Sequence, residues 1–188
     1  MRYTTRTTRI SVPLVLTAWL VAAAGCTSPG TVIDHVTRDQ SRADVRPTRA
    51  LVLAIAPDDR ITTALETEWT RQLQSRGVEA EAAATLLPGE FPPDEARVIA
   101  LVKAGRFDTL LLCRLVKVKQ AGRDATHYQS AVTETRLYDG GTGKSFWTAQ
   151  ADTFLVSGVG DRAREPRSDR LREFVGVLID EMSKDGVL

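Results

Sequence analysis

The side chain whose surroundings most clearly indicate chemistry is the thiol of Cys26. The first nine residues carry three arginines and no acid, a mostly apolar run extends from Ile10 to Ala24, and Gly25 stands directly before the cysteine. A basic start, a short apolar run and small residues before a cleavage point are the parts of a secretory signal peptide. The sequence therefore predicts an exported protein, and the thiol that follows the small residues is the candidate reactive group.

Residues 20–26 resemble a bacterial lipobox, although alanine stands at position 23 where leucine is commoner. The resemblance implies that a diacylglyceryl group is transferred to the Cys26 thiol, that cleavage falls between Gly25 and Cys26, and that the new amino terminus is acylated. The lipid bilayer would then be the first partner of the chain, through acylated Cys26. Two alternatives remain, an ordinary secretory signal and a retained membrane helix. A retained helix would need about 20 apolar residues, whereas this run is shorter and contains Pro13.

The residue after the candidate lipidated cysteine is threonine, not aspartate. By resemblance to enterobacterial sorting, Thr27 favours an anchor in the outer membrane with the domain facing the periplasm. The inner membrane remains the alternative location.

A second candidate for chemistry is the run Gly143-Lys144-Ser145, which looks like the tail of a phosphate-binding loop. That loop requires glycine five residues before Gly143, where Tyr138 stands, and it leads into a helix. A strand is predicted to follow here, so a hairpin turn is the preferred interpretation and no nucleotide is expected.

The two histidines of the chain, His35 and His127, have no cysteine or histidine at metal-ligand spacing. Neither is expected to complete a Ser-His-acid triad, because no nucleophile-elbow pattern surrounds any serine. The sequence therefore predicts no catalytic residue, no metal ligand and no cofactor, and the chain is not expected to be an enzyme.

The charge balance argues against a nucleic-acid-binding protein, and the cysteine content argues against a protein with an internal disulfide. The chain has 25 basic and 24 acidic residues, and removal of the leader with its three arginines leaves 22 basic ones. Such a near-neutral balance gives no reason to expect nucleic-acid binding. Once Cys26 carries lipid, Cys113 stands alone in an apolar run, so no internal disulfide can form and a buried, unreactive thiol is the preferred interpretation.

The chain divides into three parts. Residues 1–25 are the predicted signal peptide, residues 26–48 the lipidated cysteine with a flexible tether, and residues 49–188 a single α/β domain. The tether is assigned because residues 27–48 are polar, contain proline and glycine, and show no sustained period.

Periodicity within residues 49–188 predicts the order β-α-β-α-β-β-β-α, with one mixed sheet of about five strands covered by three helices. The apolar run from Ala50 to Ala56 is typical of a buried central strand. Glycines after Asp139 predict a hairpin between the last two strands. The predicted strands are 49–56, 78–84, 109–119, 128–138 and 144–155, and the predicted helices follow Asp58, Pro93 and Ser168.

Two stretches carry a family resemblance. The first is Phe107–Arg114, an aspartate followed by an apolar strand, and the second is Leu137–Trp147, an Asp-x-x-Thr-Gly-Lys-x-x-Trp turn. Together they resemble the amino-terminal α/β domain of TolB and a wider group of bacterial envelope proteins that includes the CsgG-like and penicillin-binding-protein-activator lipoproteins. The resemblance implies an interaction or assembly module, although a fold by itself does not fix function.

Two surfaces are candidates for binding a partner. The first is the loop 86–93, with Leu87 and Phe91 as contact residues, unless these side chains fold back onto the core. The second is the arginine-rich segment with Arg164 and Arg167, unless its mixed charges simply form a solvated face.

These observations predict a membrane-anchored envelope lipoprotein whose domain is a non-catalytic protein-interaction or assembly module and binds an envelope protein that the sequence does not identify. The alternative is a periplasmic carrier or sensor of a small apolar or lipid ligand. A pocket between sheet and helices lined by leucine, valine and phenylalanine would support the alternative.

Overall fold

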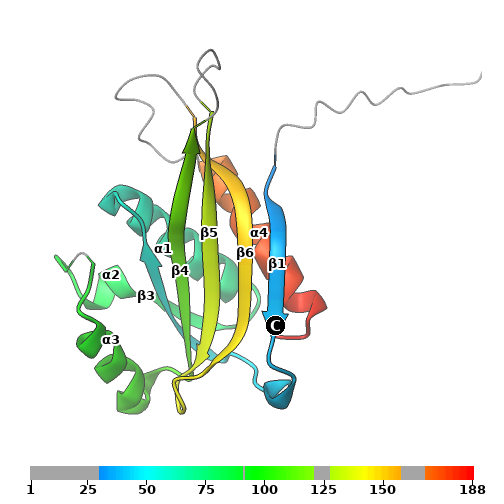
Figure 1. Cartoon of the computed structure of the whole chain (residues 1–188). Coiled ribbons are helices and arrows are strands. Elements are labelled where there is room, and N and C mark those ends of the chain that lie inside the picture. The colour runs from blue at the N-terminus through cyan, green and yellow to red at the C-terminus, as the bar shows by residue number, and fades with distance from the viewer. Residues whose placement is uncertain (1–29, 91, 121–127, 158–167) are drawn as a thin grey trace, which may run out of the picture.

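The computed structural model describes residues 30–90, 92–120, 128–157 and 168–188. These residues form one six-stranded mixed sheet with helices on both of its faces (Figure 1). The sheet order is β1-β6-β5-β4-β2-β3, in which β2 runs parallel to β3 and β4 and all other neighbours are antiparallel. The strands are β1 Val32–Arg38, β2 Arg49–Ile55, β3 Glu79–Ala82, β4 Thr109–Gln120, β5 Tyr128–Asp139 and β6 Ser145–Ser157.

The helices are α1 Asp59–Ser75, α2 Ala83–Leu86, α3 Glu95–Leu101 and α4 Ser168–Lys184, with short turns of helix η1 Gln40–Arg42 and η2 Val102–Arg106. The α/β class, the single mixed sheet and the predicted order after residue 49 are confirmed. The sheet has one strand more than expected, because β1 lies in the segment predicted to be a tether. β1 is an edge strand, and only part of its side chains are covered. Such a strand needs no continuous apolar run, so it could not be recognised from the sequence.

Local signals explain where α1 begins and ends. The Asp58 side chain accepts a hydrogen bond from the Arg60 N–H at 2.9 Å, as an N-cap residue does. Gly77 at φ 86° follows the helix and takes the left-handed conformation that non-glycine residues rarely adopt. Between these ends, Leu65, Trp69 and Leu73 form the apolar stripe that packs on the sheet.

The larger core lies between the sheet and the pair α1 and α4. Ala50, Val52 and Ala54 of β2 contact this core, which is centred on Trp69 and Phe174 with their rings edge to face at 6.4 Å. Cys113 is fully buried there, and burial raises the pKa of its thiol to about 11, so this cysteine is the inert core residue that the sequence predicts.

A smaller core covers the opposite face. Leu51 and Leu53 of β2 pack there against Ala83, Val98 and other residues of α2, α3 and η2. Because consecutive side chains of a strand point to opposite faces, the continuous apolar run of β2 is explained by burial on both sides. The helices of this second layer are short and contact mainly the part of the sheet around β2.

A β-bulge sets the packing of β6. Leu137 pairs with Trp147 whereas Tyr138 pairs with Ser145, so Phe146 is an extra residue in β6. The bulge allows the neighbouring side chains of Phe146 and Trp147 to enter the same core. The indole N–H of Trp147 donates to a carboxylate oxygen of Asp185 at 2.7 Å, which ties the end of α4 to the sheet.

The turn between β5 and β6 is the predicted hairpin. Gly143 has φ 68°, and its N–H donates to the Asp139 carbonyl at 2.7 Å. One Asp139 carboxylate oxygen accepts from the N–H and the hydroxyl of Thr142, at 2.7 and 3.0 Å. Burial acts to raise the pKa of Asp139, but the Thr142 hydrogen bonds and the Arg42 guanidinium at 2.9 Å outweigh it and lower that pKa.

Candidate functional site

The sequence-predicted site residues are not brought together in the described structure. Gly25, Cys26, Phe91, Arg164 and Arg167 lie outside the described residues. Leu87 is described, and its assignment as a partner-binding residue is wrong. It is only 4% exposed and packs in the smaller core with Ala83 and Val98.

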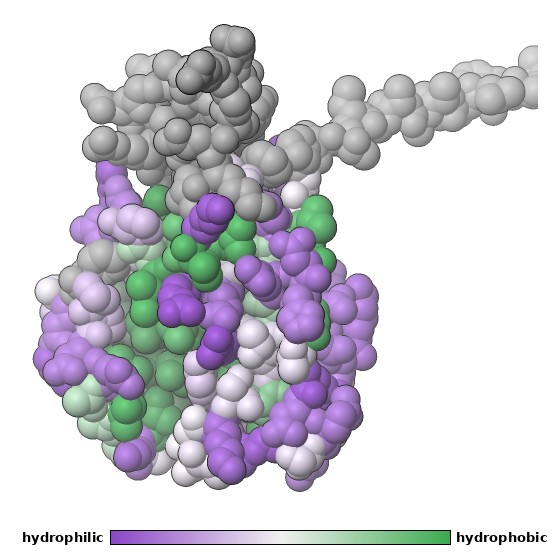
Figure 2. All heavy atoms as spheres, in the orientation of Figure 1, coloured by the Kyte–Doolittle hydropathy of each residue, from purple (hydrophilic) through white to green (hydrophobic). Residues whose placement is uncertain are grey.

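A larger opening among the described residues lies elsewhere, between α3 and the open face of the sheet. It is an apolar groove of about 740 Å³. Figure 2 shows hydrophobic side chains gathered along this part of the face, with hydrophilic ones beside them. The floor is formed by Leu53, Ile55, Leu110 and Leu112 of β2 and β4, and the wall by Val98, Ile99 and Val102. The end of β5 and the hairpin turn after it, residues 138–143, line one end.

The groove exists because the smaller layer of helices is narrower than the sheet. The side chains of Leu110 and Leu112 are only partly buried and pack at the margin of the smaller core. Ile99 on α3 is 40% exposed at the groove wall. A large apolar side chain that remains this exposed beside other apolar side chains marks a surface suited to binding.

The sheet beside the groove is polar. The neighbour of Leu112 on β5 is Arg136, and the next residue pair on this face is Arg114 with Glu134. The Glu134 carboxylate lies 2.7 Å from the Arg114 guanidinium and 2.6 Å from that of Arg136. Burial acts to raise the pKa of Glu134, but its hydrogen bonds to the two arginines outweigh it and lower that pKa. A bound group would therefore meet an apolar floor and a charged rim.

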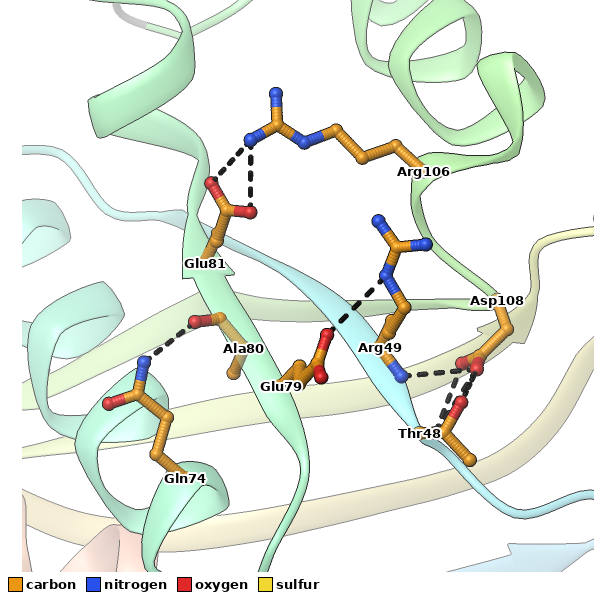
Figure 3. A network of polar contacts seen from close by, with 8 residues as sticks. All are labelled: Thr48, Arg49, Gln74, Glu79, Ala80, Glu81, Arg106 and Asp108. Carbon is orange, nitrogen blue, oxygen red and sulfur yellow. Dashed lines mark hydrogen bonds and ion pairs between the residues drawn. The ribbon is translucent and has the colours of Figure 1, made fainter.

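The two stretches that carry the family resemblance meet at the end of the sheet next to the hairpin turn. The Asp108 carboxylate accepts from the hydroxyl of Thr48 and from the N–H groups of Thr48 and Arg49, at 3.2 and 3.0 Å for the two N–H groups (Figure 3). The Asp108 carbonyl in turn accepts from the Gly140 N–H at 2.7 Å. Asp108 and Gly140 therefore fasten the start of β2 and the hairpin to the start of β4, which is a structural role.

Charged side chains of β3 form ion pairs with Arg49 and Arg106 at this edge of the sheet. Arg106 contacts both carboxylate oxygens of Glu81 at 3.1 Å, and Arg49 lies 3.7 Å from Glu79 (Figure 3). Exposed ion pairs contribute little stability, but charges on an edge strand disfavour pairing with another sheet. The four residues of β3 therefore form a protected edge.

A second, smaller cavity of about 240 Å³ lies beside Glu66 of α1. Glu66 is only 2% exposed, and its two carboxylate oxygens accept from the N–H groups of Ala54 at 3.0 Å and Ala84 at 2.9 Å. Burial raises the pKa of Glu66, and these two hydrogen bonds oppose the shift without cancelling it. Both oxygens are occupied by backbone donors, so Glu66 joins α1 to β2 and to α2 and is not a free catalytic group.

Within the described ranges, no cluster of three or more histidine, cysteine, aspartate or glutamate side chains could hold a metal ion. In the same part of the chain, no helix has both the length and the apolar character required to span a bilayer.

The fold and the groove define a class of protein, an α/β domain with one mixed sheet and an open apolar groove on one face. No protein-family profile matches the chain, and no curated protein matches its sequence. Solved structures do match in fold. One is the PelC dodecamer from Paraburkholderia phytofirmans, 13% identical, with 79% of this chain and 96% of that chain covered and a TM-score of 0.48. Another is the lipoprotein GNA1162 from Neisseria meningitidis, 18% identical, with 73% and 99% covered and a TM-score of 0.48.

Proposed function

We propose that this chain is an envelope lipoprotein, anchored through acylated Cys26 in the outer membrane, whose periplasmic domain docks a segment of another envelope protein in the apolar groove. The observation that carries the docking proposal is the groove between α3 and the sheet. The lipobox-like residues 20–26 support the anchor. The fold matches include a protein described as a lipoprotein, at low identity.

The chemistry of the groove favours a protein segment as occupant. Its floor and wall are leucine, isoleucine and valine, and Glu95 and Lys103 line its edge. The sheet beside it carries the charged row Arg114, Glu134 and Arg136. An amphipathic segment can place apolar side chains on such a floor and polar ones against such a rim, as in helix-in-groove recognition.

We expect Ile99→Lys to weaken capture of the partner at least about tenfold, because it places a charge on the apolar groove wall. A photoreactive residue in place of Lys103, at the rim, reports capture in living cells as a crosslinked band. Val116→Lys is the matched control, since Val116 of β4 is 51% exposed but does not line the groove. Both variants should unfold at nearly the wild-type midpoint, because exposed substitutions usually change stability by less than about 0.5 kcal/mol. Equal loss of the band in both variants would contradict the docking site.

The volume of the groove favours one other candidate, binding of a small apolar or lipid ligand. About 740 Å³ falls within the usual size of ligand pockets, roughly 300–1,000 Å³. A carrier should be purified with an apolar molecule that organic extraction and mass spectrometry detect, and Ile99→Lys should abolish that molecule. A protein-docking groove should instead give the crosslinked band and no such molecule.

We expect Cys26→Ser to release the protein from the membrane fraction, because the thiol is the acceptor of the first lipid group and a serine hydroxyl would not replace it. Stable anchoring requires more than one chain, and Cys26 would carry all of them. Metabolic labelling with a fatty-acid analogue and fractionation of the envelope measure the effect. Label that still enters the serine variant would rule out Cys26 as the acceptor.

A further inference from the structure

We infer that the domain stands on the bilayer with one particular end of its sheet next to the lipid headgroups, and that the groove lies at the far end. The proximal end is defined here by the row Val32, Asp152, Val132 and Lys117, which are paired across β1, β6, β5 and β4. The distal end is defined by the hairpin turn 140–144. This inference rests on the proposed acylation of Cys26.

The first observation is the short length of chain between Cys26 and the sheet. β1 begins at Val32, and the Thr31 hydroxyl is hydrogen-bonded to that of Thr153 on β6 at 2.8 Å. Only five residue steps therefore separate Cys26 from a point fixed on the sheet. In any conformation these steps span at most about 18 Å. The segment 26–48 is thus not one long spacer, because residues 32–38 are paired in the sheet.

The second observation is the direction in which β1 runs along the sheet. β1 runs from the proximal row toward the distal end, where the Arg38 guanidinium donates to the carbonyls of Ala43 at 2.7 Å and Gly186 at 3.4 Å. Seven residue steps along β5 lead from Val132 in the proximal row to Asp139 before the turn, which is about 24 Å of sheet. Figure 1 shows the start of β1 and the β5–β6 turn at opposite ends of the sheet.

The groove follows from this geometry. It is lined by Leu110 and Leu112 at the beginning of β4 and, at one end, by residues 138–143, all of which lie toward the distal end. An anchor at the proximal end therefore holds the groove away from the headgroups. In that position the groove is open to a protein in the aqueous compartment and not to the lipid surface.

Two matched lysine positions test the orientation. Lys117 and Lys144 are both exposed, the first in the proximal row and the second at the distal turn. Lys117→Cys and Lys144→Cys can each be labelled with a thiol-reactive fluorophore, because the remaining thiol, Cys113, is buried with its pKa raised to about 11. The lipidated full chain is reconstituted in phosphatidylethanolamine and phosphatidylglycerol vesicles that contain a nitroxide-headgroup lipid.

We expect the label at position 117 to lose most of its fluorescence and the label at 144 to keep it. Insertion of about 20 glycine and serine residues after Thr27, which adds roughly 25 Å of root-mean-square reach, should abolish this difference. Equal quenching at both positions without the insertion, or an unchanged difference with it, overturns the orientation. Protein that does not float with the vesicles overturns the lipid anchor itself, and the orientation falls with it.

Discussion

Gly140→Ala is expected to lower the free energy of unfolding by about 2–3 kcal/mol, as overpacking against a rigid neighbour does. A β-carbon at position 140 would lie 2.7 Å from the Phe107 carbonyl oxygen and 2.9 Å from that of Asp108. Both atoms belong to the backbone just before β4, so the contact cannot be relieved by the movement of a flexible side chain. The substitution would also strain the hydrogen bond from the Gly140 N–H to the Asp108 carbonyl. Chemical denaturation of the domain measures the change.

Gly141→Ala is the control for this prediction, because a β-carbon there would meet only an Asp139 carboxylate oxygen, at 3.4 Å. We expect it to change the unfolding free energy by less than about 0.5 kcal/mol. The same loss in both variants would mean that the turn itself, and not the close approach of two backbones, limits stability.

Glu66→Ala is expected to destabilise the domain by about 2–6 kcal/mol, the cost of two buried backbone donors that lose their acceptor. The substitution leaves the N–H groups of Ala54 and Ala84 without their acceptor, and each unsatisfied buried donor costs about 1–3 kcal/mol. Glu68→Ala on the same helix is the matched control. Glu68 pairs with Arg71 near the surface, so its loss should cost about 0.5 kcal/mol. Similar losses in the two variants would contradict the bridging role of Glu66.

The titration of Glu66 gives this prediction a pH dependence. Burial raises the pKa of Glu66 in the folded state above its value in the unfolded chain. The stability that its neutral form contributes is complete below the unfolded pKa and is lost as the pH rises through the folded pKa. Glu66→Gln cannot titrate, so the stability difference between wild type and this variant should shrink with rising pH across that window. A constant difference would mean that folding does not shift the pKa of Glu66, and a growing difference would mean that folding lowers it.

Features with local causes are those that the sequence determined. Three kinds of feature depend only on a few neighbouring residues. They are the N-cap aspartates Asp58 and Asp94, the left-handed glycines Gly77, Gly105 and Gly143, and the apolar run of β2, which is buried on both faces. The boundaries of α1, the end of the helical segment before Gly105 and the β5–β6 hairpin were therefore predictable. So was the class of the fold, which follows from the order of these elements.

Features that need a partner far along the chain were decided by the tertiary structure. The strand β1 is mostly polar and is a strand because β6 offers it a free edge. Glu66 lies next to the apolar stripe of α1 and looks solvated in the sequence, but it is buried by backbone donors at positions 54 and 84. The bulge at Phe146 breaks the alternation from which strand faces are predicted.

The groove, too, could not be predicted from the sequence, because it depends on contacts between distant parts of the chain. The apolar residues of β4 predict burial, and the sequence assigns Leu110 and Leu112 to a buried strand without showing how much of that strand is covered. Coverage depends on where α3 packs, and it packs over β2, which leaves the floor partly open beside Ile99. Hydrophobicity along a chain determines which side chains avoid water, whereas the packing of whole elements determines which of them remain exposed for a partner.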